Sequence, residues 1–104
     1  MSVLLEFSIF PIDRGESLSE EVSKVVDMIR ESGLSYQLTA MGTLIETDSV
    51  AQALKVVENA TELLNDAGCR RIYTAIKMDI RTGQNSRLES KKQSIQRLIG
   101  EVNT

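Results

Sequence analysis

The strict alternation of residues 3–10, VLLEFSIF, limits the fold more than any other feature of this sequence. Its odd-numbered positions are all apolar, whereas its even-numbered positions are Leu, Glu, Ser and Phe. A period of two predicts a β-strand that turns one face toward the core. Pro11 lacks a backbone N–H group, so the strand should end there. The segment therefore predicts a sheet with one buried face and one face of mixed character.

A helix and a hairpin are predicted next. Ser17 and Glu20 have the spacing of a capping box, and Gly33 is suited to end the helix that they begin. Residues 34–41 and 43–47 are predicted as strands, and Gly42 is the flexible residue between them. Because so little chain separates these strands, they should form a tight antiparallel hairpin.

The second half of the chain repeats the helix–strand order. Asp48 or Ser49 should cap a helix that runs to Ala67 and is closed by Gly68. Its apolar stripe is predicted at Val50, Leu54, Val57 and Leu64, with Ala53 and Ala60 beside it. Residues 71–81 form a long predicted strand, and a last helix carries Leu88, Ile95, Leu98 and Val102.

The predicted order is β-α-β-β-α-β with an extra C-terminal helix. It is typical of a ferredoxin-like α+β sandwich with a four-stranded antiparallel sheet. Residues 1–104 should form a single domain, since this length is close to the commonest domain size. The two crossover helices would cover one face of the sheet. The other face should display Leu4, Glu6, Ser8, Phe10, Gln37, Thr39, Met41, Tyr73, Lys77, Asp79 and Arg81.

This second face mixes large apolar groups with carboxylates and hydroxyls. We expect another subunit to cover it, and its apolar walls with a few polar groups would also suit a small-molecule pocket. The register of the strand at 43–47 stays open. If Ile45 faces the core, Leu44 and Glu46 face the other side of the sheet. A slip of one residue in the pairing would instead bury Leu44 and Glu46 and expose Ile45.

Composition limits the function classes. The net charge of −3 argues against sequence-independent binding to nucleic acid, and the chain lacks the roughly 18 apolar residues in a row that a membrane span needs. There is no histidine and one cysteine, so a metal site has few ligands and an internal disulfide cannot form. We therefore expect a cytoplasmic protein with no metal.

The charge is unevenly distributed along the chain. Residues 1–69 carry four basic and twelve acidic side chains (−8), and residues 70–104 carry eight basic and three acidic side chains (+5). This asymmetry indicates contacts between subunits or within the domain, or an anion site.

The candidate polar residues each have an ordinary structural interpretation. Glu46 and Asp79 could act as paired carboxylates, but Glu46 could equally form a cross-strand pair with Lys77 or Arg81. Gly42 is better explained by the hairpin turn than by approach to a ligand. The basic residues of the last helix should be solvated; they are Arg87, Lys91, Lys92 and Arg97. Cys69 should be buried at a helix–strand junction, and Tyr36 should belong to the core.

The whole chain resembles the MTH1187/YkoF-like family of small thiamine-binding proteins, UPF0045. The resemblance rests on FPID followed by SLSEEV, on MGTLIE at the end of the hairpin, and on RIYTAIKMDIR in the last strand. Asp13 departs from the pattern, because relatives often have glycine there.

This resemblance implies a ferredoxin-like homotetramer, a dimer of dimers, that binds thiamine or its pyrimidine part as a ligand and not as a cofactor, without catalysis. Thr43 and Glu46 are the matched motif positions expected to contact the ligand, followed by Asp79. Ser8 and Thr39 are added from their predicted facing. The alternative is a structural or regulatory homo-oligomer without a small-molecule site. An enzyme that uses Asp79 as a base ranks last, because no nucleophile or phosphate-binding loop accompanies it.

Overall fold

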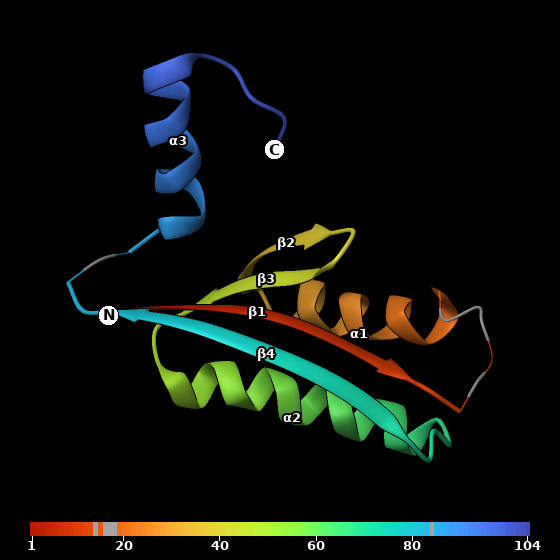
Figure 1. The fold of residues 1–104 in the computed structure, drawn as a ribbon. Helices are drawn as coiled ribbons and strands as arrows, with labels where there is room; N and C mark the ends of the chain where they lie inside the picture. The colour runs from red at the N-terminus through yellow and green to blue at the C-terminus, as the bar shows by residue number, and fades with distance from the viewer. Residues whose placement is uncertain (14, 16–18, 84) are drawn as a thin grey trace.

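The computed structural model describes residues 1–13, 15, 19–83 and 85–104. Its four strands form one antiparallel sheet in the order β2-β3-β1-β4 (Figure 1). The predicted ferredoxin-like order of elements is confirmed, with a third helix after the last strand. The elements are β1 (Ser2–Pro11), α1 (Ser19–Glu31), β2 (Ser35–Thr39), β3 (Gly42–Thr47), α2 (Val50–Asp66), β4 (Ile72–Arg81) and α3 (Arg87–Ile99).

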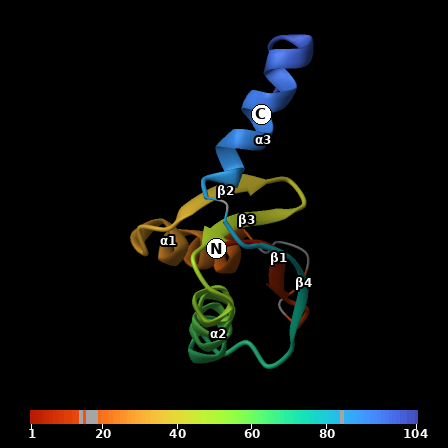
Figure 2. The same ribbon diagram turned by 90° about the vertical axis from the view of Figure 1, so that its left-hand side faces the viewer.

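The core lies between the sheet and two helices. Helices α1 and α2 lie side by side on one face of the sheet (Figure 2). The odd-numbered residues of β1 point toward these helices and are buried, as the alternation predicts. Ile45 of β3 lies opposite Leu5 and is fully buried, so Leu44 and Glu46 turn to the other face. This arrangement settles the register that the sequence leaves open.

Helix α2 begins as predicted but buries a different stripe. The Ser49 side chain caps it by accepting a hydrogen bond from the Gln52 N–H, at 3.1 Å. The predicted core residue Leu54 is 47% exposed, whereas Val56 is 5% exposed. The prediction for Leu54 is therefore wrong. The helix is rotated so that its line of contact with the sheet follows Ala53, Val56, Ala60 and Leu64.

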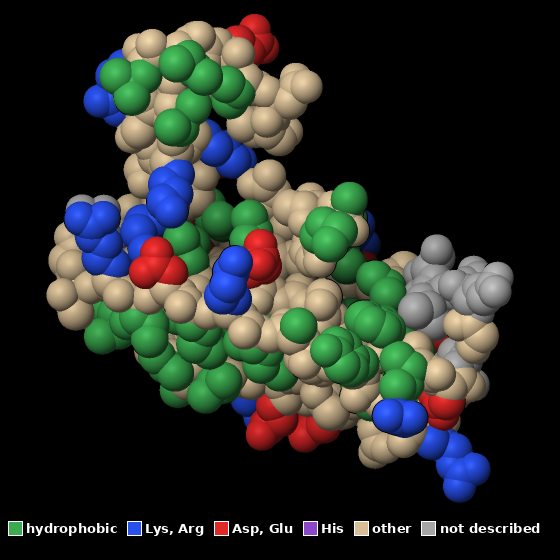
Figure 3. Space-filling model, in the orientation of Figure 1, with side chains coloured by type: hydrophobic (Ala, Val, Ile, Leu, Met, Phe, Trp, Pro, Cys, Tyr) green, Lys and Arg blue, Asp and Glu red, His purple; other side chains and the backbone are tan. Residues whose placement is uncertain are grey.

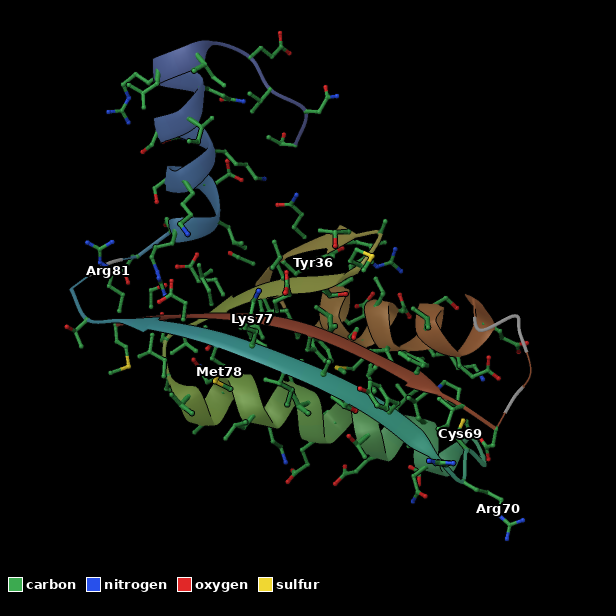
Figure 4. The ribbon with its side chains drawn as sticks, in the orientation of Figure 1. Tyr36, Cys69, Arg70, Lys77, Met78 and Arg81 are labelled. Atoms are coloured by element: carbon green, nitrogen blue, oxygen red, sulfur yellow. The ribbon has the colours of Figure 1, made fainter. Side chains whose placement is uncertain are left out.

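Two further predictions about the core are confirmed. Cys69 is buried at the junction of α2 and β4, as expected (Figure 4), and Tyr36 packs against the core. The predicted capping residue Ser17 lies outside the described residues.

The turn of the hairpin is Ala40–Met41, and Gly42 is already the first residue of β3. A Cβ atom on Gly42 would lie 2.9 Å from the Phe7 carbonyl oxygen, so close contact with β1, and not the turn, requires this glycine.

Helix α3 projects away from the rest of the fold, on the side of the sheet opposite α1 and α2 (Figures 1 and 2). Its apolar residues near the C-terminal end remain in solvent, and Leu98 is 80% exposed. The predicted helix residue Val102 lies beyond its end. Figure 3 shows hydrophobic side chains over the free end of α3 and along the β4 side of the sheet. In the described part of the chain, no helix has the length and apolar character needed to cross a membrane.

Candidate functional site

The five predicted site residues fall into two separate places. Glu46 and Asp79 lie at the end of the sheet where α3 begins. Ser8, Thr39 and Thr43 lie near the tip of the β2–β3 hairpin. Each place has its own geometry.

Glu46 accepts hydrogen bonds from both β1 and α3. Its Oε2 atom accepts from the Ser2 hydroxyl at 2.5 Å and from the Arg87 backbone N–H at 3.0 Å. Its Oε1 atom accepts from the Leu88 backbone N–H at 3.4 Å. The first N–H groups of a helix have no partner within the helix, so a carboxylate placed there stabilises its start. Glu46 therefore caps α3 from a residue 41 positions earlier in the chain.

The pKa of Glu46 is lowered by this environment. Partial burial raises the pKa, because it disfavours the charged form. The hydrogen bonds from Ser2 and from the two backbone N–H groups, with the charge of Arg87, outweigh burial and hold the pKa below its ordinary value. Glu46 is thus an ionised hydrogen-bond acceptor in the fold.

Arg87 joins β1, β4 and α3 through its guanidinium group. Its Nε donates to the Ser2 hydroxyl at 3.0 Å, and one terminal nitrogen donates to the Asp79 carboxylate at 2.9 Å. The other terminal nitrogen donates to the backbone carbonyls of Ser2, at 2.8 Å, and Asp79, at 2.5 Å. Arg87 is 4% exposed, so the expectation that it is solvated with the other basic residues of α3 is wrong. We call Ser2, Glu46, Asp79 and Arg87 the α3 anchor.

The sequence interpretation also misses the partner of Glu46. The expected cross-strand pair with Lys77 or Arg81 is not found among the described residues. The Lys77 Nζ atom instead lies 3.5 Å from Glu6 Oε1, on the face of the sheet away from the helices. Arg81 lies at the end of β4 (Figure 4). Neither Ser2 nor Arg87 belongs to a sequence motif that would identify it as a partner of Glu46. Their roles depend on where α3 leaves the sheet, which hydropathy patterns do not encode.

A hollow of about 400 Å³ lies beside the hairpin tip, and we call it the hairpin hollow. Its walls come from the second half of β1, from α1 and from the hairpin. The lining residues are Phe7–Phe10, Val22, Val25, Val26 and Leu38–Thr43. The walls are mainly apolar, and they include the predicted site residues Ser8, Thr39 and Thr43. A groove of about 630 Å³ between α1 and β2 shares Val22, Val26 and Leu38 with it.

The hydroxyl groups of the hairpin hollow differ in their partners. Thr39 Oγ1 donates to the Gly42 carbonyl at 2.8 Å and accepts from the Met41 N–H at 3.3 Å, so it shapes the turn. Within the described residues, no hydrogen bond involves the hydroxyl of Ser8 or Thr43. These two groups can therefore donate to or accept from a bound molecule. The described residues contain no cluster of three acidic or cysteine side chains suited to a metal ion.

Comparison with known proteins identifies the family. The profile of the family described as thiamine-binding protein matches residues 5–96. A UPF0045 protein of Mycobacterium bovis is 36% identical over 99 residues, which covers 95% of this chain and 96% of that protein. The crystal structure of a hypothetical Methanocaldococcus jannaschii protein superimposes with a TM-score of 0.77 at 32% identity, covering 90% of this chain and 95% of that one. A Thermotoga maritima structure at 16% identity has the same fold, with a TM-score of 0.76 over 90% of this chain and 99% of that one. The chain therefore belongs to the thiamine-binding protein family.

Proposed function

We propose that this protein binds thiamine or a related aminopyrimidine in the hairpin hollow, without catalysis, as a homo-oligomer. The observation that carries the proposal is that a chain of this family has a mainly apolar hollow lined by three of the residues predicted to contact the ligand. Its volume of about 400 Å³ falls in the range of small-molecule sites. The Thermotoga maritima protein with the same fold has a proposed role in thiamine biosynthesis or salvage, which is consistent with the same ligand class.

The chemistry of the hollow suits an aminopyrimidine ring. Such a ring has two apolar faces and an edge of hydrogen-bond donors and acceptors. The valine side chains of α1 would contact a face, and the hydroxyls of Ser8 and Thr43 would bond to the edge. Phe10 lines the hollow, and its ring centroid lies 5.6 Å from that of Tyr73. These rings would attract the thiazolium cation of thiamine through their faces.

Glu46 and Asp79 enter the proposal in a different way. Both carboxylates contact α3, so the contacts of the folded chain support a role in holding the helix. A direct ligand contact from Glu46, as the family motif implies, would require the loss of these bonds. Binding measured with Glu46→Gln separates the two roles. A role in holding α3 leaves thiamine affinity unchanged, whereas a direct contact predicts weaker binding.

Exposed apolar surfaces support the oligomeric part of the proposal. Strand β4 is an edge of the sheet, and its Ile76 and Ile80 are 46% and 51% exposed although they face the helix layer. Apolar edge strands are prone to pair with other chains unless they are covered. The free end of α3 adds Ile95, Leu98 and Ile99. A homotetramer would cover both surfaces with second copies of the chain.

The binding proposal is tested by thermal unfolding with and without thiamine. A concentration of one hundred times Kd should stabilise the folded protein by about 2.7 kcal/mol, which corresponds to about 10 °C or more in Tm for a domain of this size. Thr43→Val and Ser8→Ala should reduce the shift. Thr61→Val, on the exposed side of α2 and away from the hollow, is the matched control and should keep it. No shift with thiamine or with hydroxymethylpyrimidine would remove the proposal.

Native mass spectrometry tests the assembly on the same sample. The expected result is a tetramer that carries thiamine. A tetramer that never takes up the ligand would favour the alternative, a structural or regulatory oligomer. A monomer that binds thiamine would leave the binding site in place and refute the oligomer.

A further inference from the structure

Strand β1 has a partner on both sides over only half of its length. It pairs with β4 from Ser2 to Pro11, but its pairing with β3 ends at Phe7, opposite Thr43. The hairpin turns back at Ala40–Met41 and β3 begins at Gly42, beside Phe7 and Ser8, so β3 has no residue to place beside residues 9–11. Residues 9–11 therefore have an unpaired backbone edge on the β3 side, and this edge borders the hairpin hollow.

The register shows which backbone groups point into the hollow. In an antiparallel ladder, alternate residues direct both their N–H and C=O groups to the same neighbouring strand. The Ile12 N–H donates to the Arg71 carbonyl at 2.9 Å, and this contact continues the β1–β4 register, so even-numbered residues bond toward β4. The Phe7 carbonyl lies beside Gly42 of β3, as an odd-numbered residue should. Ile9 therefore directs its N–H and C=O groups toward the hairpin hollow.

The neighbouring chain does not satisfy these two groups. The Met41 N–H, which would face Ile9 in a longer hairpin, bonds instead to the Thr39 hydroxyl at 3.3 Å. In the described residues, no partner takes the N–H or C=O of Ile9 on this side. Pro11, the next odd-numbered residue, has no N–H group. Ile9 thus offers a donor and an acceptor side by side at an apolar hollow, where unpaired backbone groups favour a polar partner.

We propose that the backbone of Ile9 recognises the amino edge of the pyrimidine, so that the ligand completes the strand edge that the short hairpin leaves open. This inference rests on the proposed function. The amino group on C4 of the ring would donate to the Ile9 carbonyl oxygen, and ring atom N3 would accept from the Ile9 N–H. Peptides that add to a sheet edge are held by the same pair of backbone groups. The hydroxyls of Ser8 and Thr43 flank this pair on the two faces of the sheet.

The recognition has a consequence for specificity. In oxythiamine, a carbonyl on C4 replaces the amino group and N3 carries a hydrogen, so the donor and acceptor are exchanged. The analogue bound in the same orientation would set N–H against N–H and oxygen against oxygen. Sites that hydrogen-bond a ligand group discriminate strongly against analogues that leave their polar groups unpaired. Hydrophobic contact alone would treat the two molecules almost alike, because their size and shape are nearly the same.

Titration of the intact protein with thiamine and with oxythiamine tests the inference. The expected result is that oxythiamine binds about a hundredfold more weakly than thiamine. Affinities within threefold of each other would refute recognition by Ile9 while leaving thiamine binding established. If neither compound binds, the proposed function fails, and the inference fails with it.

A backbone substitution tests the same contact from the side of the protein. Replacing Ile9 by its α-hydroxy acid exchanges the N–H for an ester oxygen and keeps the side chain. It should weaken thiamine binding about tenfold, because one hydrogen bond is lost. The matched control is the same replacement at Tyr36 of β2, whose N–H points to the open edge away from β3 by the same alternation and which does not line the hairpin hollow. Unchanged binding in the Ile9 ester, or equal losses in the Ile9 and Tyr36 esters, would overturn the inference. If the Ile9 ester does not fold, the comparison of thiamine with oxythiamine decides.

Discussion

Replacing Arg87 by methionine should release α3 from the sheet and leave the rest of the fold intact. Methionine keeps much of the aliphatic length of the side chain, and it removes the guanidinium group with its four hydrogen bonds. Helix α3 touches the sheet through its first turn, so these bonds and those of Glu46 are the main attachment of the helix.

The expected magnitude follows from the partners of Arg87. Two of the bonds go to Ser2, which is buried, and losing hydrogen bonds from a charged group costs about 1.5–3 kcal/mol. The Asp79 side chain is 61% exposed, so the ion pair adds about 1 kcal/mol or less. Burying methionine costs about as much side-chain conformational entropy as burying arginine, so the substitution regains little stability from this entropy. These contributions sum to about 1.5–4 kcal/mol, and the middle of this range, about 2–3 kcal/mol, corresponds to roughly a 30- to 150-fold increase in the equilibrium constant for opening.

Native-state hydrogen exchange measures this opening at single residues. The Leu88 N–H, bonded to Glu46, and the Ser90 N–H, bonded to the Ser86 carbonyl, should exchange roughly 30- to 150-fold faster in Arg87→Met. Amides of β1 that pair with β4 should keep their rates. Arg97→Met, on the exposed part of the same helix, is the matched control and should change neither set. Unchanged exchange in α3, or an equal rise in β1, would refute the idea that the α3 anchor holds a separable helix.

Three further predictions follow from the surroundings of Glu46, Gly42 and Val56. The folded-state pKa of Glu46 is depressed, so its stabilisation is present above the unfolded-state pKa and is lost as pH falls through the folded-state pKa. In urea unfolding, the difference between the protein and Glu46→Gln should thus be complete at pH 7 and should shrink as the pH is lowered below 4.5, the ordinary value for a glutamate; a difference that grows on acidification would contradict it. Gly42→Ala should cost about 1–3 kcal/mol in the same assay, because its methyl group would press on the Phe7 carbonyl, and an unchanged midpoint would mean that β3 shifts freely. Val56→Ala should cost about 2 kcal/mol and Leu54→Ala less than about 1 kcal/mol, the reverse of what the sequence pattern predicts, and the opposite order would place Leu54 in the core.

The fold could be predicted from the sequence because its signals are local. The alternation of residues 3–10, the cap at Ser49 and the short connection at Gly42 each limit a few neighbouring dihedral angles. The order of the elements then leaves few ways to arrange the sheet. The stripe of α2 was harder to predict, since Leu54 and Val56 are both apolar and two residues apart. Rotation of the helix on the sheet decides which of them is buried, and rotation depends on packing.

The candidate site could be predicted only in part. Ser8, Thr39 and Thr43 share the hairpin hollow because strand pairing places them near the same turn. The role of Glu46 depends on Arg87, which follows it by 41 residues. A basic residue at the start of an exposed helix looks solvated in sequence, and its burial arises because α3 starts directly over the ends of β1 and β4. Neither residue type nor spacing encodes that position.

Strand β3 connects the two places and keeps them apart. Its Thr43 end borders the hairpin hollow, and its Glu46 end holds α3. Three residues of strand separate these side chains by about 10 Å, and they point to opposite faces of the sheet. Groups at such a distance without shared partners act additively within one chain. Weakening the α3 anchor should therefore leave the direct ligand contacts of a single chain unchanged. If Arg87→Met, which leaves the Glu46 carboxylate in place, nevertheless changes thiamine affinity, the effect would have to pass through a second copy of the chain packed against the exposed Leu98 and Ile99, and assembly would then complete the hairpin hollow.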